Sequence, residues 1–250
     1  MVYEQPLNER LRTFLRLEFL YRQLRYHLEQ PSPWDSRAAI TSMLDIVAIL
    51  TRGDVRSDVL KELERQLAAF DQLQNKPQVD NKRLEGILRN LRQHRHELAQ
   101  VAPQYLMLLR ENEFLNSIKH RSAIPGGTCE FDLPDYTHWL RQPAERRKAD
   151  VEHWLGGLQP LCEGLAELLW LMRAGTAGGT QVAPGGVFQY SLGRDAHYNL
   201  LRVVLPGRSG IYPEISASQH RLSVRFMQWS DVATRAVQVE EDVSFELQLC

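Results

Sequence analysis

A short segment near the middle of the chain holds residues that could perform thiol chemistry. In the stretch IPGGTCEFDLP, residues 124–134, Cys129 and Asp132 lie three residues apart, and His138 follows six residues later. A thiol nucleophile, a base and a group that orients the base are the parts of a cysteine-dependent protease or transferase. A cytoplasmic thiol-dependent enzyme is therefore one interpretation of this sequence.

The same segment has a second interpretation as a structural turn. No recognised active-site signature surrounds Cys129, and the glycines at 126–127 can adopt the unusual backbone angles of a tight corner. Those glycines also lack the GK[ST] sequence of a phosphate-binding loop. On this interpretation Phe131 and Leu133 anchor the segment, ahead of a short helix at 136–140.

Metal and cofactor chemistry find little support in the residue pattern. His94 and His96 stand two residues apart in a predicted helix, so their side chains point about 200° apart and cannot share one ion. The three cysteines are far apart, which is not the pattern of a disulfide framework and fits a reducing compartment. We expect no metal and no cofactor.

Two groups of basic residues could bind an acidic partner instead. Arg52, Arg56 and Lys61 lie across the RGDV turn and the start of the helix that follows it. Arg221 and Arg225 share one face of a predicted strand, about 13 Å apart, and guanidinium groups bind carboxylates through paired hydrogen bonds. The alternative for each group is an ordinary solvated surface.

The overall composition limits the class of partner. The chain of 250 residues has 30 Lys and Arg against 31 Asp and Glu, a net charge of −1. This balance gives no general attraction to nucleic acids or acidic lipids, so charge recognition must be local. The N-terminus does not have the pattern of a signal peptide, and the longest apolar run is too short to span a bilayer. We expect a cytoplasmic protein with no nucleic-acid partner and no membrane insertion.

The elements that must position these residues change in character near residue 175. Before it, apolar residues recur at helical spacing. The predicted helices cover about 6–28, 36–50, a stretch from the RGDV turn to 73, 80–101, 103–121, 136–140, and a last one from 143 that Pro160 kinks or restarts. Asp80 is expected to cap a helix whose near-heptad apolar seam could pair with a neighbouring helix or with a second copy of the chain.

After residue 185 the apolar pattern changes to a period of two. It predicts five strands, in GVFQYSL, NLLRVVLP, IYPEIS, HRLSVRFMQW and EDVSFELQLC. The glycine-rich stretch 174–186 is expected to be a flexible connector. The predicted fold class is α+β. An all-helical domain at 1–175, whose first few residues could join the sheet, precedes a small antiparallel β-sheet domain at 176–250.

Four stretches of the sequence, taken together, point to a known family. They are YEQPLNERLRTFLRLEFL at the start, RGDVRSDVLKELERQ at 52–66, IPGGTCEFDLP at 124–134, and YPEIS with HRLSVRFM at 212–227, which leads to the terminal FELQLC. In this order and spacing they resemble the ZapD family of bacterial cell-division proteins. The resemblance covers the chain from Tyr3 to Cys250, but residues 32–39 and 231–239 match poorly and receive no functional assignment.

The resemblance implies a binding protein and not an enzyme. ZapD-like proteins have a helical and a β-rich domain, act as symmetric homodimers at mid-cell, and bundle filaments of the tubulin-like protein FtsZ at the division ring. They hold the C-terminal tail of FtsZ in a basic pocket. Carried over by position, the expected tail-binding residues are Arg52, Arg56, Lys61, Arg221 and Arg225. Arg12 and Arg16 are expected at the dimer interface or at the rim of the pocket, and segment 124–134 is then structural.

Overall fold

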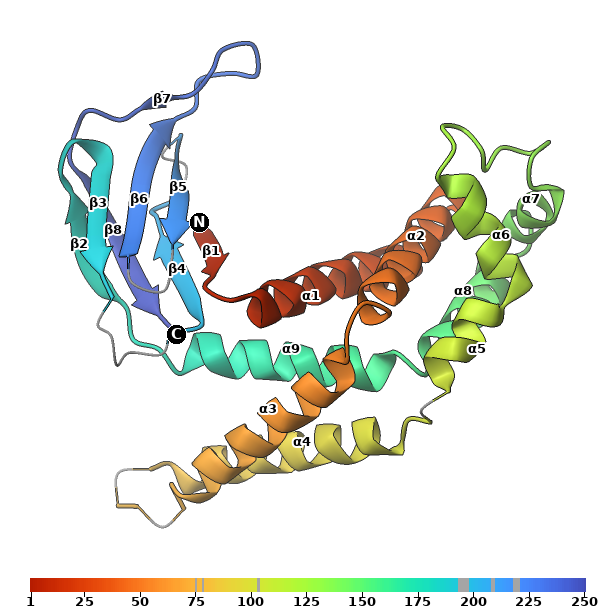
Figure 1. The fold of residues 1–250 in the computed structure, drawn as a ribbon, viewed down its shortest axis with the longest axis horizontal. Helices are drawn as coiled ribbons and strands as arrows, with labels where there is room; N and C mark the ends of the chain where they lie inside the picture. The colour runs from red at the N-terminus through yellow and green to blue at the C-terminus, as the bar shows by residue number, and fades with distance from the viewer. Residues whose placement is uncertain (75, 78, 103, 193–197, 208–209, 218–220) are drawn as a thin grey trace. The chain divides into compact units, whose positions relative to one another are not determined.

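Helices and strands occupy different parts of the chain in the computed structural model (Figure 1). The structure describes residues 1–250 except 75, 78, 103, 193–197, 208–209 and 218–220. After a first strand at Val2–Pro6, helices fill the N-terminal two thirds and the other antiparallel strands follow, so the predicted α+β class is confirmed. The chain divides into two compact units, a β-rich unit of Met1–Leu15 with Leu169–Cys250 and a helical unit of Arg16–Leu168. The predicted domain boundary at residue 175 stays a prediction.

The helices follow the predicted order, with one division that the sequence pattern did not indicate. They are α1 (Glu9–Leu28), α2 (Pro33–Leu50), α3 (Val55–Asp71), α4 (Asn81–Gln100), α5 (Tyr105–Glu111), α6 (Glu113–Ser122), α7 (Pro134–Leu140), α8 (Ala144–Leu155) and α9 (Gln159–Ala174). The single helix predicted over 103–121 is wrong. Asn112 leaves the helical conformation with ψ 112°, and its side chain accepts a hydrogen bond from the amide of Leu115 at 3.0 Å, which starts α6 as a separate helix.

The apolar seam of α4 is covered by a neighbouring helix of the same unit. Asp80 caps α4 as predicted, because its carboxylate accepts a hydrogen bond from the amide of Arg83 at 3.1 Å. Leu88 and Leu91 of the seam are buried, and α4 packs against α3. The structure therefore places a neighbouring helix against the seam, and pairing with a second copy of the chain stays a prediction.

The strands form two four-stranded antiparallel sheets. They are β1 (Val2–Pro6), β2 (Gly179–Ala183), β3 (Val187–Ser191), β4 (Leu200–Val204), β5 (Ile211–Ala217), β6 (Arg221–Gln228), β7 (Val237–Gln238) and β8 (Val243–Leu249). One sheet has the order β1-β4-β8-β2, and the other has β3-β6-β5 with β7 paired to β6. The expected flexible connector is wrong in part, because Gly179–Ala183 pairs with β8 as strand β2.

The core of the β-rich unit fixes which side chains of β6 face outward. Leu222, Val224 and Phe226 are fully buried, and they join side chains of both sheets in one apolar cluster. Successive side chains of a strand point to opposite faces, so Arg221 and Arg225 must lie on the other face, where both are exposed. The alternation predicted for this strand is confirmed.

A half-buried carboxylate joins three elements of the β-rich unit. Glu4 on β1 accepts two hydrogen bonds from Arg173 of α9, each 2.8 Å long, and one from Arg202 of β4 at 2.9 Å. Bidentate guanidinium–carboxylate pairs of this kind are directional, so they fix the position of the Glu4 side chain between α9 and β4. The N-terminal strand is thereby held against β4, with which it pairs.

A buried guanidinium joins the connections of the helical unit. Arg147 of α8 is 4% exposed. Its side chain donates hydrogen bonds to the carbonyls of Leu140 and Gln142 at the end of α7, to the carbonyl of Pro31 before α2, and to the hydroxyl of Ser36. Carbonyls at the C-terminal end of a helix lack intrahelical donors, and Arg147 supplies one to Leu140, the last residue of α7, while it also ties this end to the segment before α2.

We expect Arg147→Met to lower the free energy of unfolding by about 3 kcal/mol, because it leaves buried carbonyls without donors while keeping most of the side-chain volume. Urea unfolding followed by circular dichroism measures the change. Arg146→Met is the matched control, since the side chain of Arg146 is exposed and its ion pair, with Asp150, is local to the same helix. It should stay within about 0.5 kcal/mol of the parent. Equal stabilities for both variants would contradict this role of Arg147.

Candidate functional site

The RGDV segment forms the turn between α2 and α3. Asp54 caps α3, because its carboxylate accepts a hydrogen bond from the amide of Ser57 at 3.1 Å. Hydrogen bonds from Ser57 lower the pKa of the Asp54 carboxyl, and the positive charges of Lys61 and Arg56 act in the same direction. The turn therefore carries an ionised acid as well as the predicted basic residues.

Arg56 acts as a cap for a second helix. Its Nη2 atom donates to the carbonyls of Leu98 at 3.1 Å, Ala99 at 3.3 Å and Val101 at 3.4 Å, all at the C-terminal end of α4. Its Nε atom is buried without a hydrogen-bond partner among the described residues. The Nη2 atom of Arg56 is therefore occupied by contacts within the fold, so this residue would act on a ligand mainly through its positive charge.

The other two basic residues of this group are exposed. Arg52 lies in the turn and Lys61 on α3. Lys61 follows Arg56 by five residues, which places the two side chains about 140° apart around the helix axis. The structure brings all three residues to the start of α3 without aligning them on one face.

The second basic group is a rigid pair on the outer face of one sheet. Arg221 and Arg225 are exposed on β6, and Ser223 lies between them on the same face. Ser223 is flanked across the sheet by Ser216 of β5 and Gln189 of β3. Short polar side chains between the two guanidinium groups leave this surface accessible to an extended ligand.

Arg225 has an acidic neighbour that the sequence pattern did not reveal. Glu214 of β5 lies directly opposite it in the strand register, and its carboxylate is 2.9 Å from Nη2 of Arg225. Both side chains are about half exposed, so the pair is weak and open to exchange. Alternation within β5 could place Glu214 on this face, but the pairing register could not be read from the sequence.

Arg12 and Arg16 are both on α1 but differ in their contacts. Arg12 pairs with Glu9 of the same helix at 3.1 Å, which is a local contact between exposed groups. Arg16 is exposed on the next turn. The role predicted for them at a dimer interface or a pocket rim stays a prediction.

Segment 124–134 is built as a corner. Gly126 has φ +73°, and a Cβ on Gly127 would collide with the backbone carbonyl of Arg121, so both positions require glycine. Leu133 is buried as expected, but the anchoring predicted for Phe131 is wrong, since that side chain is 86% exposed. In an irregular turn no periodicity fixes which side chains point inward.

The thiol and the imidazole have different partners. The Sγ atom of Cys129 donates to Asp132 at 3.3 Å, and Asp132 also pairs with Arg121 at 3.3 Å. The imidazole of His138 contacts the side-chain amide of Gln142 at 3.1 Å on the exposed side of α7. Among the described hydrogen bonds none joins Cys129 to His138, so the geometry of a thiol and an activating base is not formed here.

Within the described part of the chain, no three His, Cys, Asp or Glu side chains come together in a way that could hold a metal ion. His94 and His96 belong to no such group. None of the described helices combines the length and the apolar character needed to cross a bilayer.

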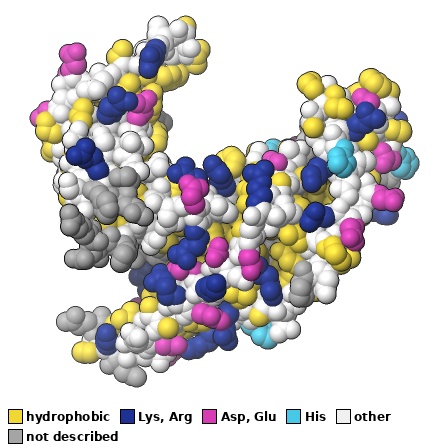
Figure 2. Space-filling view, viewed as in Figure 1, with side chains coloured by type: hydrophobic (Ala, Val, Ile, Leu, Met, Phe, Trp, Pro, Cys, Tyr) yellow, Lys and Arg dark blue, Asp and Glu magenta, His cyan; other side chains and the backbone are white. Residues whose placement is uncertain are grey.

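Charge on the visible surface is mixed. Figure 2 shows Lys and Arg side chains interspersed with Asp and Glu, as expected for a chain with a net charge of −1. Recognition of an acidic partner must therefore depend on local geometry, as at Arg221 and Arg225, and not on the total charge.

Comparison with known proteins covers nearly the whole chain. The family model of ZapD, described as a cell division protein, matches residues 15–225. Cell division protein ZapD of Methylococcus capsulatus is 40% identical over 250 residues, covering 100% of this chain and 98% of that protein. The protein of the same name from Aromatoleum aromaticum is 37% identical over 249 residues, covering 99% and 96%. That from Cupriavidus pinatubonensis is 41% identical over 252 residues, covering 100% and 99%.

We expect Arg56→Met to lower the free energy of unfolding by about 1.5 kcal/mol, because the carbonyls at the end of α4 lose their donor. Lys61→Met removes the same charge from an exposed position of the same helix and should change stability by less than about 0.5 kcal/mol. Thermal unfolding of the two variants beside the parent measures the difference. A larger loss in Lys61→Met would show that the cap is unimportant.

Proposed function

The chain belongs to the ZapD family of cell division proteins, and on that premise we propose that it binds the C-terminal tail of FtsZ. The observation that carries the proposal is the outward pair Arg221 and Arg225 on β6, held rigid by the core beneath it. These are the positions at which the sequence resembles the tail-binding residues of the family. Carboxylates of the tail bind the two guanidinium groups through charge-assisted hydrogen bonds.

Binding of the tail at Arg225 replaces one carboxylate by another, because Glu214 already pairs with this guanidinium. A tail carboxylate that reaches Arg225 displaces the carboxylate of Glu214, which is half exposed and can turn toward water. The net free energy of binding from each contact is therefore small, and each tail associates weakly. Salt weakens the association further, because the charges are exposed.

Weak contacts bundle filaments when they are multiplied. In the proposed mechanism the chain acts as a homodimer with two-fold symmetry, so two tail sites face different filaments. Many tails along each FtsZ polymer raise the effective local concentration, and the filaments stay joined while single tails exchange. We propose that this takes place in the cytoplasm at mid-cell, with the division ring.

The helical unit supplies further basic residues. Arg52 and Lys61 are exposed and can bind carboxylates directly. Arg56 contributes its positive charge while its Nη2 atom caps α4. Loss of tail binding in an Arg56 variant would therefore mix a change in fold with a change in charge, so Arg52 and Lys61 are the better sites to test. No catalytic step is part of this mechanism.

Co-sedimentation with GTP-polymerised FtsZ tests the proposal. The parent should pellet with full-length FtsZ and stay in solution with FtsZ that lacks its C-terminal tail. Arg221→Glu/Arg225→Glu should reduce pelleting with full-length FtsZ to background, because each tail carboxylate then meets a like charge. Arg89→Glu/Arg95→Glu makes the same charge change at exposed positions of α4 and should pellet like the parent.

Two results would contradict the proposal. Pelleting with both forms of FtsZ would place the site on the filament body. Pelleting that is lost in Cys129→Ala but kept in the double arginine variant would favour the thiol interpretation of segment 124–134.

We expect Glu214→Gln to strengthen the binding of a tail peptide, because Arg225 no longer has a competing carboxylate. An exposed ion pair is worth up to about 1 kcal/mol, so the dissociation constant should fall by roughly threefold to fivefold. Isothermal titration calorimetry measures it. Glu241→Gln makes the same charge change at another exposed position of the β-rich unit and should leave the affinity unchanged. Weaker binding by Glu214→Gln would mean that Glu214 supports the site and does not compete with the tail.

A further inference from the structure

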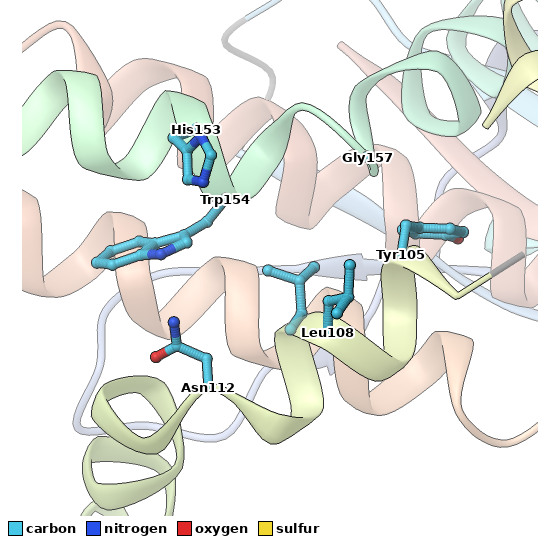
Figure 3. Close-up of a pocket in the computed structure, with 7 residues that line it drawn as sticks. Tyr105, Leu108, Asn112, His153, Trp154 and Gly157 are labelled. Carbon is cyan, nitrogen blue, oxygen red and sulfur yellow. The ribbon is translucent and has the colours of Figure 1, made fainter. Parts of the chain in front are cut away.

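A cavity of about 320 Å³ lies between α5 and α8 in the helical unit (Figure 3). Trp154 of α8 and Tyr105 of α5 stand at its two ends, and Leu108 lies between them. Asn112, which follows α5, and Gly157, which follows α8, also line the cavity. Ligand-binding cavities range from roughly 300 to 1,000 Å³, so this one suits one or two apolar side chains better than a large cofactor.

The walls of the cavity are preformed. A Cβ on Gly157 would lie 2.9 Å from Cδ2 of Tyr105, so glycine is what allows this ring to lie against the turn after α8. The indole of Trp154 stacks on Phe114 with ring centroids 5.7 Å apart and planes 28° apart. Asn112 is held as the cap of α6. A ligand would therefore enter this cavity at little cost in side-chain ordering.

The helix that forms one wall has few partners for its apolar residues. Residues 105–109 of α5 read YLMLL, yet no side chain of this helix is fully buried. Leu108 is 64% exposed and Met107 is 48% exposed. Leu108 lines the cavity, so a ligand in the cavity would cover apolar surface that is otherwise exposed to water.

Positive charge adjoins this apolar cavity within the same unit. The Nη2 atom of Arg56 donates hydrogen bonds to the carbonyls of Leu98, in the last turn of α4, and of Val101, which follows that helix four residues before Tyr105. Burial raises the pKa of the Tyr105 hydroxyl, and the charges of Arg56 and Asp54 act on it in opposite directions, so the RGDV turn is within electrostatic reach. A ligand that carries a carboxylate close to an apolar side chain could satisfy both features.

We propose that the cavity between α5 and α8 receives an apolar side chain of the FtsZ tail, while the basic residues at the start of α3 attract the tail carboxylates. This inference rests on the proposed function and names an apolar contact for the tail within the helical unit. Charge complementarity selects this occupant, because an acidic and apolar peptide matches both the cations and the cavity.

The test uses the full chain and a fluorescently labelled synthetic FtsZ tail peptide, with binding followed by anisotropy. Leu108→Ser should weaken binding by roughly fivefold to tenfold through the loss of apolar contact. Leu108 is largely exposed, so the variant should fold. Met107→Ser is the matched control, because Met107 is exposed on the same helix and is not among the residues that line the cavity. It should bind like the parent.

Two further measurements test whether the apolar contact lies in the cavity. A tail peptide whose apolar residues are replaced by serine should bind the parent and Leu108→Ser equally, because the two changes remove the same contact. The tail should also change the tryptophan emission of the parent, and Trp154→Phe should abolish most of this change while keeping an aromatic wall.

The outcomes separate this inference from the proposed function. Equal affinity of the parent and Leu108→Ser for the natural tail overturns the inference and leaves tail binding intact. No binding of the tail to the parent overturns both. If Leu108→Ser lowers self-association in sedimentation velocity and leaves tail affinity unchanged, the cavity receives a second copy of the chain, which also overturns the inference.

Discussion

A helix that ends inside a protein leaves backbone carbonyls without intrahelical donors, and this chain meets that constraint with arginine. Arg147 supplies donors to the end of α7 and to the segment before α2, and Arg56 supplies them to the end of α4. A guanidinium has several donors in one plane and stays charged when it is buried, so one side chain can replace several lost hydrogen bonds. These contacts join α8 to the end of α7 and to the segment before α2, and the start of α3 to the end of α4. The same need explains why an arginine that resembles a ligand-binding residue by position, Arg56, also belongs to the framework.

The β-rich unit presents arginine in a different way. Its core takes Leu222, Val224 and Phe226 from one face of β6, and the pleat then directs Arg221 and Arg225 to solvent. Both guanidinium groups lie on the exposed face of β6, away from the apolar core, so a change of partner there does not disturb the packing of that core. Glu214 pairs with Arg225 and offsets part of the positive charge of this surface. The proposed joining of filaments requires weak, exchangeable binding of this kind.

Periodicity was sufficient to predict the fold class, five of the strands and the cap at Asp80, because each depends on residues close together in the sequence. Features that depend on distant partners were not predicted. β2 lies in a glycine-rich stretch with little strand character of its own and exists through its pairing with β8. Asn112 divides a helix that apolar spacing alone would continue. The Glu214–Arg225 pair follows from strand register, and the cavity beside Trp154 follows from a close approach at Gly157, neither of which leaves a local signal.

The central claim is that tail carboxylates pair with the guanidinium groups of β6, and a charge exchange between the two partners tests it most directly. Arg225→Glu would be mixed with full-length FtsZ polymers in which the acidic residues of the C-terminal tail are replaced by lysine one at a time. The account predicts that Arg225→Glu loses binding to natural FtsZ and that at least one lysine-substituted tail restores it. If Arg225→Glu binds natural FtsZ as the parent does, or if no lysine-substituted tail restores binding, the carboxylates of the tail are not the partners of this strand.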